Sequence, residues 1–300
     1  MRTPLAIIAA AGLLVGSAPL GVAPWAAGQQ APIDPALTQH VDAAEHVAPP
    51  GELTTIDSGH VDLGPMLAPS KGLFARDDTA TSPVWRHLDD VVFYVSNAAA
   101  QQLPAGDEFA FVGAAPGETV WVVPQTEVAG VPWLGWNTQS PSLLNAADQG
   151  VTFEFAGHQG PGDFSLFLQN GGFEPPQVLW LSSADSTQTF WAQLNTHTHA
   201  NWVFTEPGIH KVALTITAPL NDGTEFTDTQ ILTFAVGENT DPAAAHFTEW
   251  EGALPETAAA EETSSKSGAG TVVFFAVAGL LLAVVIGGPL VALRQKAARR

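Results

Sequence analysis

The sequence predicts an all-β domain built as a β-sandwich. Short runs in which apolar and polar residues alternate recur between Leu53 and Val236, and Gly, Pro, Asn and Asp separate them. No stretch has the spacing of a long amphipathic helix. The 300 residues include no cysteine, so disulfides and Cys-based metal sites are excluded and packing must stabilise the fold.

The predicted strands follow one another in short steps along the chain. The early ones are Val91–Val95, Glu108–Gly113, Thr119–Val123, Val151–Ala156, Asp163–Leu168 and Thr187–Leu194. The closing ones are Thr196–Thr205, Ile209–Ala218 and Glu225–Val236. A tight turn at Glu206–Gly208 and a hairpin turn at Asn221–Gly223 join these last three strands. This ending is typical of an immunoglobulin-like sandwich, which we predict for residues 52–237.

The two ends of the chain predict export. Residues 1–28 have the features of a secretory signal peptide, with Arg2 before an apolar run and small residues up to Gly28; an uncleaved anchor is the alternative. Residues 271–293 are 23 uncharged residues, enough for a single C-terminal transmembrane helix. The basic tail that follows, 294–300, predicts a cytoplasmic C-terminus and a domain outside the cell.

Two low-complexity segments flank the predicted domain. Residues 29–51 are interpreted as a linker, and residues 238–270 as a solvated stalk. The stalk contains Leu254-Pro255-Glu256-Thr257-Ala258, which resembles the sorting signal of sortase substrates, Leu-Pro-x-Thr-Gly, with Ala258 in place of Gly. Attachment to the cell wall by a sortase and plain membrane anchoring are both open.

The exported part is strongly acidic. It holds all 30 acidic residues and only five basic ones, for a formal charge of about −25; the basic residues are Lys71, Arg76, Arg86, Lys211 and Lys266. Such a charge repels nucleic acid and attracts cations, although an acidic surface also serves solubility. We therefore expect no nucleic-acid partner.

Two histidines open the predicted strand Thr196–Thr205. Because side chains alternate along a strand, His197 and His199 point to the same side, as two metal ligands would. The other interpretation is a pair of exposed polar residues that contribute little to packing. Metal binding needs neutral imidazole, so it should weaken as the pH falls through the usual His pKa of about 6.5.

A second pair supplies the completing ligands in this hypothesis. His60 and Asp62 also share one face if Gly59–Asp62 is a strand, and histidine with carboxylate is a usual set for transition metals. A strand-end His and a turn Asp are the alternative. We predict a zinc or manganese site made of His197, His199, His60 and Asp62. His87 and His158 are weaker candidates, and His210 joins the site only if the hairpin register allows it.

The residues give no sign of catalysis. The sequence lacks a G-x-S-x-G elbow, a P-loop, an H-E-x-x-H pair and a dinucleotide fingerprint, so we predict a protein that is not an enzyme. Six tryptophans are either stacking platforms for a ligand such as a carbohydrate or core residues. They are Trp121, Trp133, Trp136, Trp180, Trp191 and Trp202, of which Trp133 and Trp136 lie in a predicted loop.

One motif resembles a known family. The pattern H-x-H-x-N-W-x-F-x-x-P-G followed by an alternating strand, Thr196–Ala218, resembles the repeat of actinobacterial surface-anchored proteins, the choice-of-anchor M family. Shorter segments also resemble it: Gly59–Pro65, Asp89–Val95, Trp121–Gln125, Val131–Thr138 and Gly160–Phe167. The family pattern has an aromatic residue where this chain has His210.

The resemblance implies a role at the cell surface. Family members accompany a metal-type ABC transporter, so this chain is expected to be an anchored receptor for zinc or manganese that works with the transporter's substrate-binding protein. The alternative function is a structural or adhesive wall protein that binds a protein or glycan partner.

Overall fold

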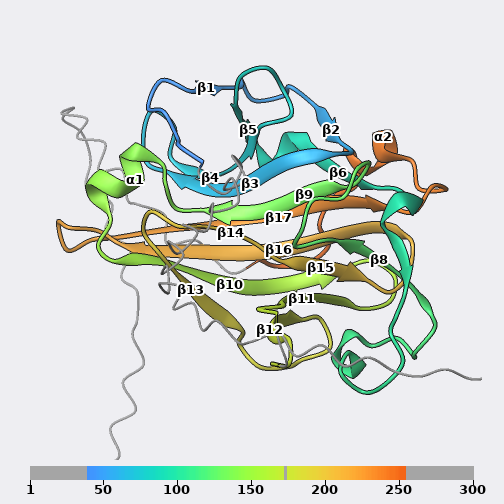
Figure 1. Ribbon diagram of the computed structural model, residues 1–300. Helices are drawn as coiled ribbons and strands as arrows, with labels where there is room; N and C mark the ends of the chain where they lie inside the picture. The colour runs from blue at the N-terminus through green and yellow to red at the C-terminus, as the bar shows by residue number, and fades with distance from the viewer. Residues whose placement is uncertain (1–38, 172–173, 255–300) are drawn as a thin grey trace, which may run out of the picture. The chain divides into compact units, whose positions relative to one another are not determined.

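Seventeen strands in three sheets form the framework of the described chain, residues 39–171 and 174–254 of the computed structural model (Figure 1). Two α-helices, α1 (Pro141–Ala146) and α2 (Pro242–Ala245), and 3-10 turns at Leu88–Asp90, Asn97–Ala99 and Ala110–Val112 complete them. The all-β prediction is confirmed for these residues. The immunoglobulin-like arrangement stays a prediction.

Sheet A carries the candidate site. Its six strands lie in the order β1–β5–β4–β3–β9–β14. Their bounds are His46–Val47 (β1), Val84–His87 (β5), Gly72–Asp77 (β4), Gly59–Met66 (β3), Pro132–Asn137 (β9) and His197–His199 (β14). β3 and β9 are parallel, and β14 joins β9 antiparallel at the edge of the sheet.

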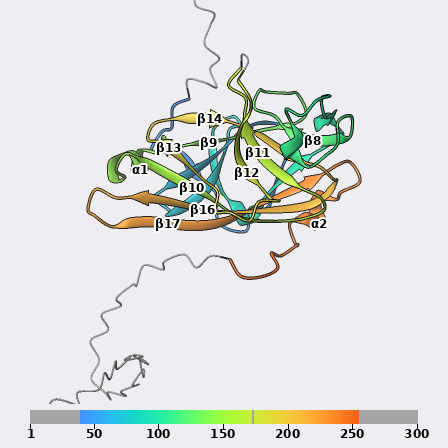
Figure 2. The same ribbon diagram turned by 90° about the horizontal axis from the view of Figure 1, so that it is seen from below.

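Sheets B and C complete the fold. Sheet B has the order β13–β10–β16–β17–β6–β2, with bounds Thr189–Gln193, Gly150–Gln159, Gly208–Pro219, Glu225–Val236, Val91–Val95 and Thr54–Ile56. Sheet C has the order β12–β11–β15–β8–β7, with bounds Gln177–Leu181, Phe164–Leu168, Asn201–Phe204, Thr119–Val123 and Ala100–Gln102. Figure 2 shows β9 and β14 on the opposite side of the molecule from β16 and β17.

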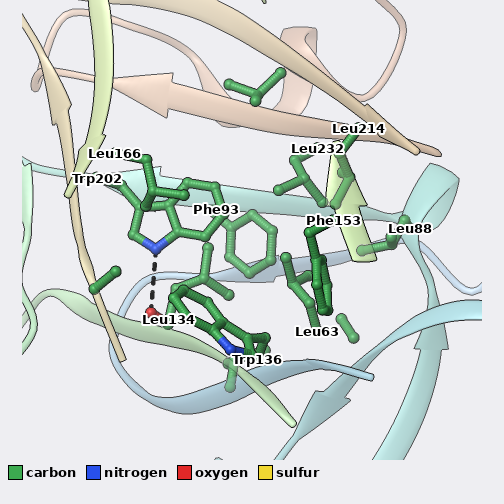
Figure 3. Close-up of a cluster of buried hydrophobic side chains, with 14 of the residues drawn as sticks. Leu63, Leu88, Phe93, Leu134, Trp136, Phe153, Leu166, Trp202, Leu214 and Leu232 are labelled. Atoms are coloured by element: carbon green, nitrogen blue, oxygen red, sulfur yellow. Dashed lines mark hydrogen bonds between the residues drawn. The ribbon is translucent and has the colours of Figure 1, made fainter. Parts of the chain in front are cut away.

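The main core lies between the three sheets. Leu63 and Trp136 from sheet A, Phe93 and Phe153 from sheet B, and Trp202 from sheet C are all buried in one cluster (Figure 3). The indole nitrogen of Trp202 donates a hydrogen bond of 3.2 Å to the carbonyl of Leu134, so even the polar atom of this core residue is satisfied. Trp202 and Phe204, two residues apart on β15, are both buried in this core.

Most predicted strands are confirmed, but Glu108–Gly113 is not a strand and Thr196–Thr205 is not one continuous strand. Val91–Val95, Thr119–Val123 and Glu225–Val236 form strands with the predicted bounds. Glu108–Gly113 instead contains the 3-10 turn Ala110–Val112, followed by Gly113 at φ 89°. Its apolar residues would lie on both faces of a strand. The segment therefore lacks the alternation of apolar and polar residues that distinguishes a strand from a turn.

The predicted strand Thr196–Thr205 is divided between two sheets. β14 pairs with β9 in sheet A, whereas β15 pairs with β11 and β8 in sheet C, and the buried Ala200 lies between them. A strand that passes from one sheet to another must bend at the corner. The bend leaves the two histidines on sheet A while Trp202 enters the core.

The turn Glu206–Gly208 does not close a hairpin. β15 already has a neighbour on each edge in sheet C, so the chain continues into sheet B, where β16 pairs with β10 and β17. The predicted hairpin at Asn221–Gly223 is confirmed, since β16 and β17 pair along their whole length.

The folded part extends beyond residues 52–237 at both ends. β1 and the buried Val41 lie within the segment predicted as a linker, and α2 with its buried Ala245 lies within the predicted stalk. Small apolar residues in these segments suffice for packing although they show no periodicity. The predicted signal peptide, the transmembrane helix at 271–293, the basic tail and all of the sorting-like motif except Leu254 lie outside the described residues. No helix within the described part is long and apolar enough to span a membrane.

Candidate metal centre

Three neighbouring strands of sheet A bring the predicted ligands together. β9 lies between β3 and β14, and the register places Asp62 of β3 and His199 of β14 opposite the same residue, Gly135. Leu63 and Leu134, one position along their strands, point into the main core. Because side chains alternate, the ligands point to the other face of the sheet.

The remaining two ligands are placed by the same register. His60 lies opposite Trp133, and His197 lies opposite Asn137. His60 precedes Asp62 by two residues, so both point to one face. All four predicted ligands therefore gather over the middle of β9, and they form a group that could hold a metal ion.

Gly135 provides the space in which they meet. A Cβ atom at this position would lie 2.5 Å from the carbonyl oxygen of Thr198 and 2.9 Å from both Asp62 Oδ1 and His199 Cε1. Any larger residue would push the ligands apart. The need for glycine here comes from close approach, not from an unusual backbone angle.

The four donor atoms form a compact cluster. The Nε2 atoms of the three histidines are 3.0–3.1 Å apart, and Asp62 Oδ1 lies 2.9, 3.6 and 3.8 Å from those of His197, His60 and His199. Each atom thus faces the other three. Together they enclose one common point.

Hydrogen bonding alone does not explain the three imidazoles. The Nε2 atom of a neutral imidazole carries either a hydrogen or a lone pair, never both. Among three such atoms, at least two therefore both carry a hydrogen or both carry a lone pair. Such a pair cannot form a hydrogen bond. A cation at the centre accepts a lone pair from each of them.

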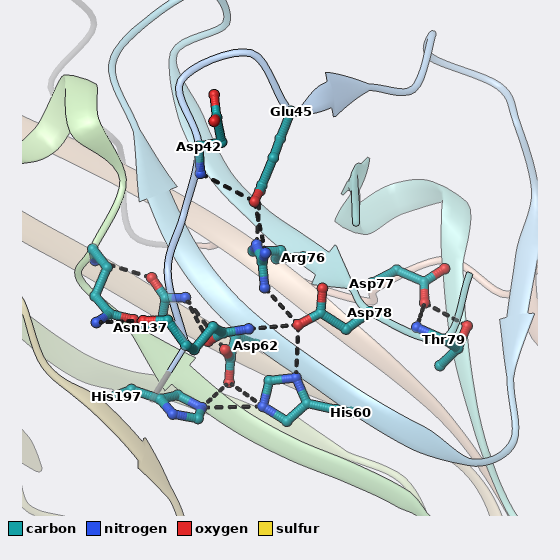
Figure 4. A network of polar contacts seen from close by, with 12 residues as sticks. Asp42, Glu45, His60, Asp62, Arg76, Asp77, Asp78, Thr79, Asn137 and His197 are labelled. Carbon is teal, nitrogen blue, oxygen red and sulfur yellow. Dashed lines mark hydrogen bonds and ion pairs between the residues drawn. The ribbon is translucent and has the colours of Figure 1, made fainter. Parts of the chain in front are cut away.

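A partly buried polar network orients His60 (Figure 4). Its Nδ1 lies 3.0 Å from Asp78 Oδ2, which accepts the ring hydrogen and leaves Nε2 free to face the cluster. Asp78 Oδ2 also accepts a hydrogen bond of 2.5 Å from Arg76, whose guanidinium donates two more to Glu45. This chain of ion pairs holds the ring in one orientation.

Asp62 is positioned from the other side. The amide nitrogen of Asn137 donates hydrogen bonds of 3.2 Å to Asp62 Oδ2 and to the side-chain oxygen of Gln39. Gln39 in turn donates to Asp78. Asp62 therefore turns Oδ2 toward Asn137 and Oδ1 toward the histidines, among them His197 (Figure 4).

The surroundings shift the pKa values of three ligands. Burial alone would raise the pKa of Asp62, but the hydrogen bond with His197 and the charges of the histidines hold it below its usual value. Burial opposes protonation of His60, yet Asp78 and Asp62 raise its pKa. Burial lowers the pKa of His199 to about 3. A proton therefore competes with a metal ion for His60. Asp62 stays ionised and His199 stays neutral, which are the forms that bind metal.

The alternative interpretation, in which the two histidines are an exposed pair, is wrong. His199 is only 5% exposed, and the indole of Trp133 stacks on its ring at 4.1 Å and 18°. Residues 39–48 pack over this face of sheet A, where Val41 is buried with Met66. The segment covers the site because its apolar residues find a second, smaller core there.

The weaker histidine candidates lie elsewhere. His210 is on β16 in sheet B, so no hairpin register brings it to His199; its Nδ1 lies 3.0 Å from His158 Nε2. His87 packs against Phe74, with ring centroids 5.0 Å apart. None of the three belongs to the metal group.

The tryptophans act mainly as packing residues. Trp133, Trp136, Trp180 and Trp202 are buried, whereas Trp191 is 57% exposed. The supporting residues of the site were not predicted: Gly135, Asp78, Asn137, Arg76 and Gln39. The one sequence signal among them is Gly135, a glycine between large residues in a buried strand.

Comparisons with protein-family models, with curated proteins and with solved structures found no match. The interpretation of the site therefore depends on its own geometry.

Proposed function

We propose that this chain is an exported, non-catalytic surface protein that binds a divalent transition metal, zinc or manganese. The ligands are His60, Asp62, His197 and His199. The observation that supports this best is the convergence of their four donor atoms within 3.8 Å. Imidazole nitrogen and carboxylate oxygen are suitable donors for such ions.

The charges around the site favour a dication. Asp62, Asp78 and Glu45 each carry a negative charge, and Arg76 carries the only positive one in this connected network. With neutral imidazoles the network has a net charge of −2. Burying uncompensated charge is costly, and a divalent ion would neutralise this network.

The biological role follows from sequence features. The predicted signal peptide and the segment 271–293 support an anchored ectodomain, for which we propose the immunoglobulin-like sandwich. The motif Thr196–Ala218 supports a receptor that hands its metal to the substrate-binding protein of an ABC transporter. A structural or adhesive wall protein is the alternative if no metal binds.

Isothermal titration of the tag-free, full-length protein in mild detergent tests the proposal. We expect the parent protein to bind Zn²⁺ or Mn²⁺, and the double variant His197→Ala, His199→Ala to lose that binding. Because His199 is buried beneath Trp133, this variant also loses packing. The nearly isosteric Asp62→Asn is therefore a second test; because Asp62 is a direct ligand, we expect a loss of at least about 10–100-fold in affinity, the range typical for changes in the residues that only support a ligand.

The His158–His210 pair provides a matched control. It is a second close histidine pair on another sheet, and the double variant His158→Ala, His210→Ala should keep the parent's affinity. Equal binding by the parent and by both site variants would contradict the proposal. So would the absence of binding by the parent, which would favour the wall-protein alternative.

A further inference from the structure

The geometry of the four donors points to one metal. We infer that the site is a closed, four-coordinate tetrahedral site selective for Zn²⁺ over Mn²⁺. The inference rests on the proposed function, because it names the ion that this same site takes. It uses the mutual distances of His60, Asp62, His197 and His199 and the chemistry of their donor atoms.

The six separations between the donor atoms fit a tetrahedron. They lie between 2.9 and 3.8 Å. In a regular tetrahedron with metal–ligand bonds of about 2.0–2.1 Å, ligand atoms are about 3.3–3.4 Å apart. The observed distances lie on both sides of that value, and a small adjustment makes them equal.

The same distances disfavour an octahedron. Only three ligands of an octahedral ion can all be neighbours of one another, so a fourth must lie opposite one of them. Two opposite ligands are twice the bond length apart, above about 4 Å. No pair among the four donors is farther apart than 3.8 Å. Square-planar coordination fails for the same reason, since it has two opposite pairs.

The donor types agree with the distances. Three imidazole nitrogens and one carboxylate oxygen are usual for zinc, whereas manganese prefers oxygen-rich octahedral sites. The general order of divalent-metal affinities also places Zn²⁺ above Mn²⁺. Geometry and donor chemistry therefore favour the same ion.

The rigidity of the site preserves this preference. Asp62 is fully buried, and Asn137 fixes its second oxygen. Asp78 orients His60, and Trp133 stacks on His199. Expansion to six ligands would require these groups to separate and water to enter. We expect Zn²⁺ to bind at least about 100-fold more tightly than Mn²⁺.

Cobalt is the spectroscopic probe for coordination number. Co²⁺ is added to the metal-free, full-length protein without a tag, and its visible d–d absorption is recorded. We expect the intense bands of four-coordinate Co²⁺ and their complete bleaching by one equivalent of Zn²⁺. An excess of about 100-fold Mn²⁺ should not bleach them.

Two variants locate the signal. His197→Ala should weaken Co²⁺ binding and change the position and intensity of the bands, because it removes one of the four protein ligands. His158→Ala, which removes a histidine outside the site, should leave them unchanged. If the His197→Ala protein does not fold, Asp62→Asn, which keeps the side-chain shape, provides the same comparison. A site variant with the parent's bands and the parent's Co²⁺ affinity would overturn the assignment.

The outcomes separate this inference from the proposed function. Weak, six-coordinate Co²⁺ bands, or Mn²⁺ affinity equal to that of Zn²⁺, would overturn zinc selectivity while metal binding stands. Failure of Zn²⁺, Mn²⁺ and Co²⁺ alike to bind would overturn both. Tetrahedral bands displaced by Zn²⁺ alone would support both.

Discussion

Asp62 and His199 lie on strands that are not neighbours, and they face each other across Gly135 on the strand between them. Asp62 Oδ1 and His199 Nε2 are 3.8 Å apart, although β9 separates their strands. The contact is possible because Gly135 has no side chain. The missing side chain of Gly135 thus leaves the space in which ligands from the two flanking strands, β3 and β14, approach each other.

The first prediction concerns the space above Gly135. Gly135→Ala would place a Cβ 2.9 Å from Asp62 Oδ1, so we expect metal affinity to fall about 10–100-fold. Overpacking should also lower the free energy of unfolding by about 1–3 kcal/mol. Zinc titration and thermal unfolding measure the two effects.

Gly64→Ala is the matched control for this substitution. Its Cβ would lie 2.7 Å from the indole of Trp85, on the same sheet but outside the donor cluster. It should lower stability and leave affinity close to the parent's. Equal losses of affinity in both variants would show that Gly135 acts only through stability.

The second prediction concerns Asp78, which accepts the ring hydrogen of His60. Asp78→Asn should reduce zinc affinity about 10–100-fold, because the tautomer of His60 is no longer fixed. The tetrahedral Co²⁺ spectrum should persist, since Asp78 is not itself a ligand. Asp77→Asn is the control: its carboxylate pairs with Arg86 and Thr79, so its loss should cost stability but not affinity. An unchanged affinity in Asp78→Asn would refute the positioning role.

The third prediction concerns the His158–His210 pair. Burial lowers the pKa of both rings to about 4. The charge of Asp163 has a smaller, raising effect on the pKa of His158, and the neighbouring His158 lowers the pKa of His210 further. Between pH 6.5 and 4 the unfolded chain therefore binds more protons than the folded one. Stability contributed by the neutral pair is full above pH 6.5 and is lost as the pH falls toward 4.

Denaturant unfolding across this pH range measures the effect. We expect the free energy of unfolding of the parent to fall by about 1–3 kcal/mol more than that of His158→Gln, His210→Gln, after discounting for partial exposure. Other titrating groups are common to both proteins and cancel in the difference. Parallel pH profiles would contradict the prediction.

The fourth prediction concerns anchoring. If Leu254–Ala258 is a functional sorting signal, Thr257→Ala should move the protein from the peptidoglycan fraction to the membrane fraction. Cell fractionation with and without wall-degrading enzymes measures this. A parent protein with no covalent attachment to the wall would instead leave the segment 271–293 as the predicted anchor.

Individual strands were predictable wherever one face is apolar. The bounds of β17 follow from its alternation, whereas β6 and β8 were recognised as short, almost continuous apolar runs. Glu108–Gly113 failed because its short apolar run fits a 3-10 turn ending at Gly113 as well as it fits a strand. Thr196–Thr205 failed for another reason: the alternation continues through the bend at Ala200 and does not reveal a change of sheet.

The sequence by itself determined the types and spacing of the ligands. His197 and His199, like His60 and Asp62, are two residues apart, and a strand must then turn each pair to one face. Only the tertiary structure decided that the two pairs meet. They are separated by more than 130 residues, and the register of β3 and β14 against β9 joins them. The register between strands depends on how whole sheets pack, so it cannot be predicted from residue spacing within one strand.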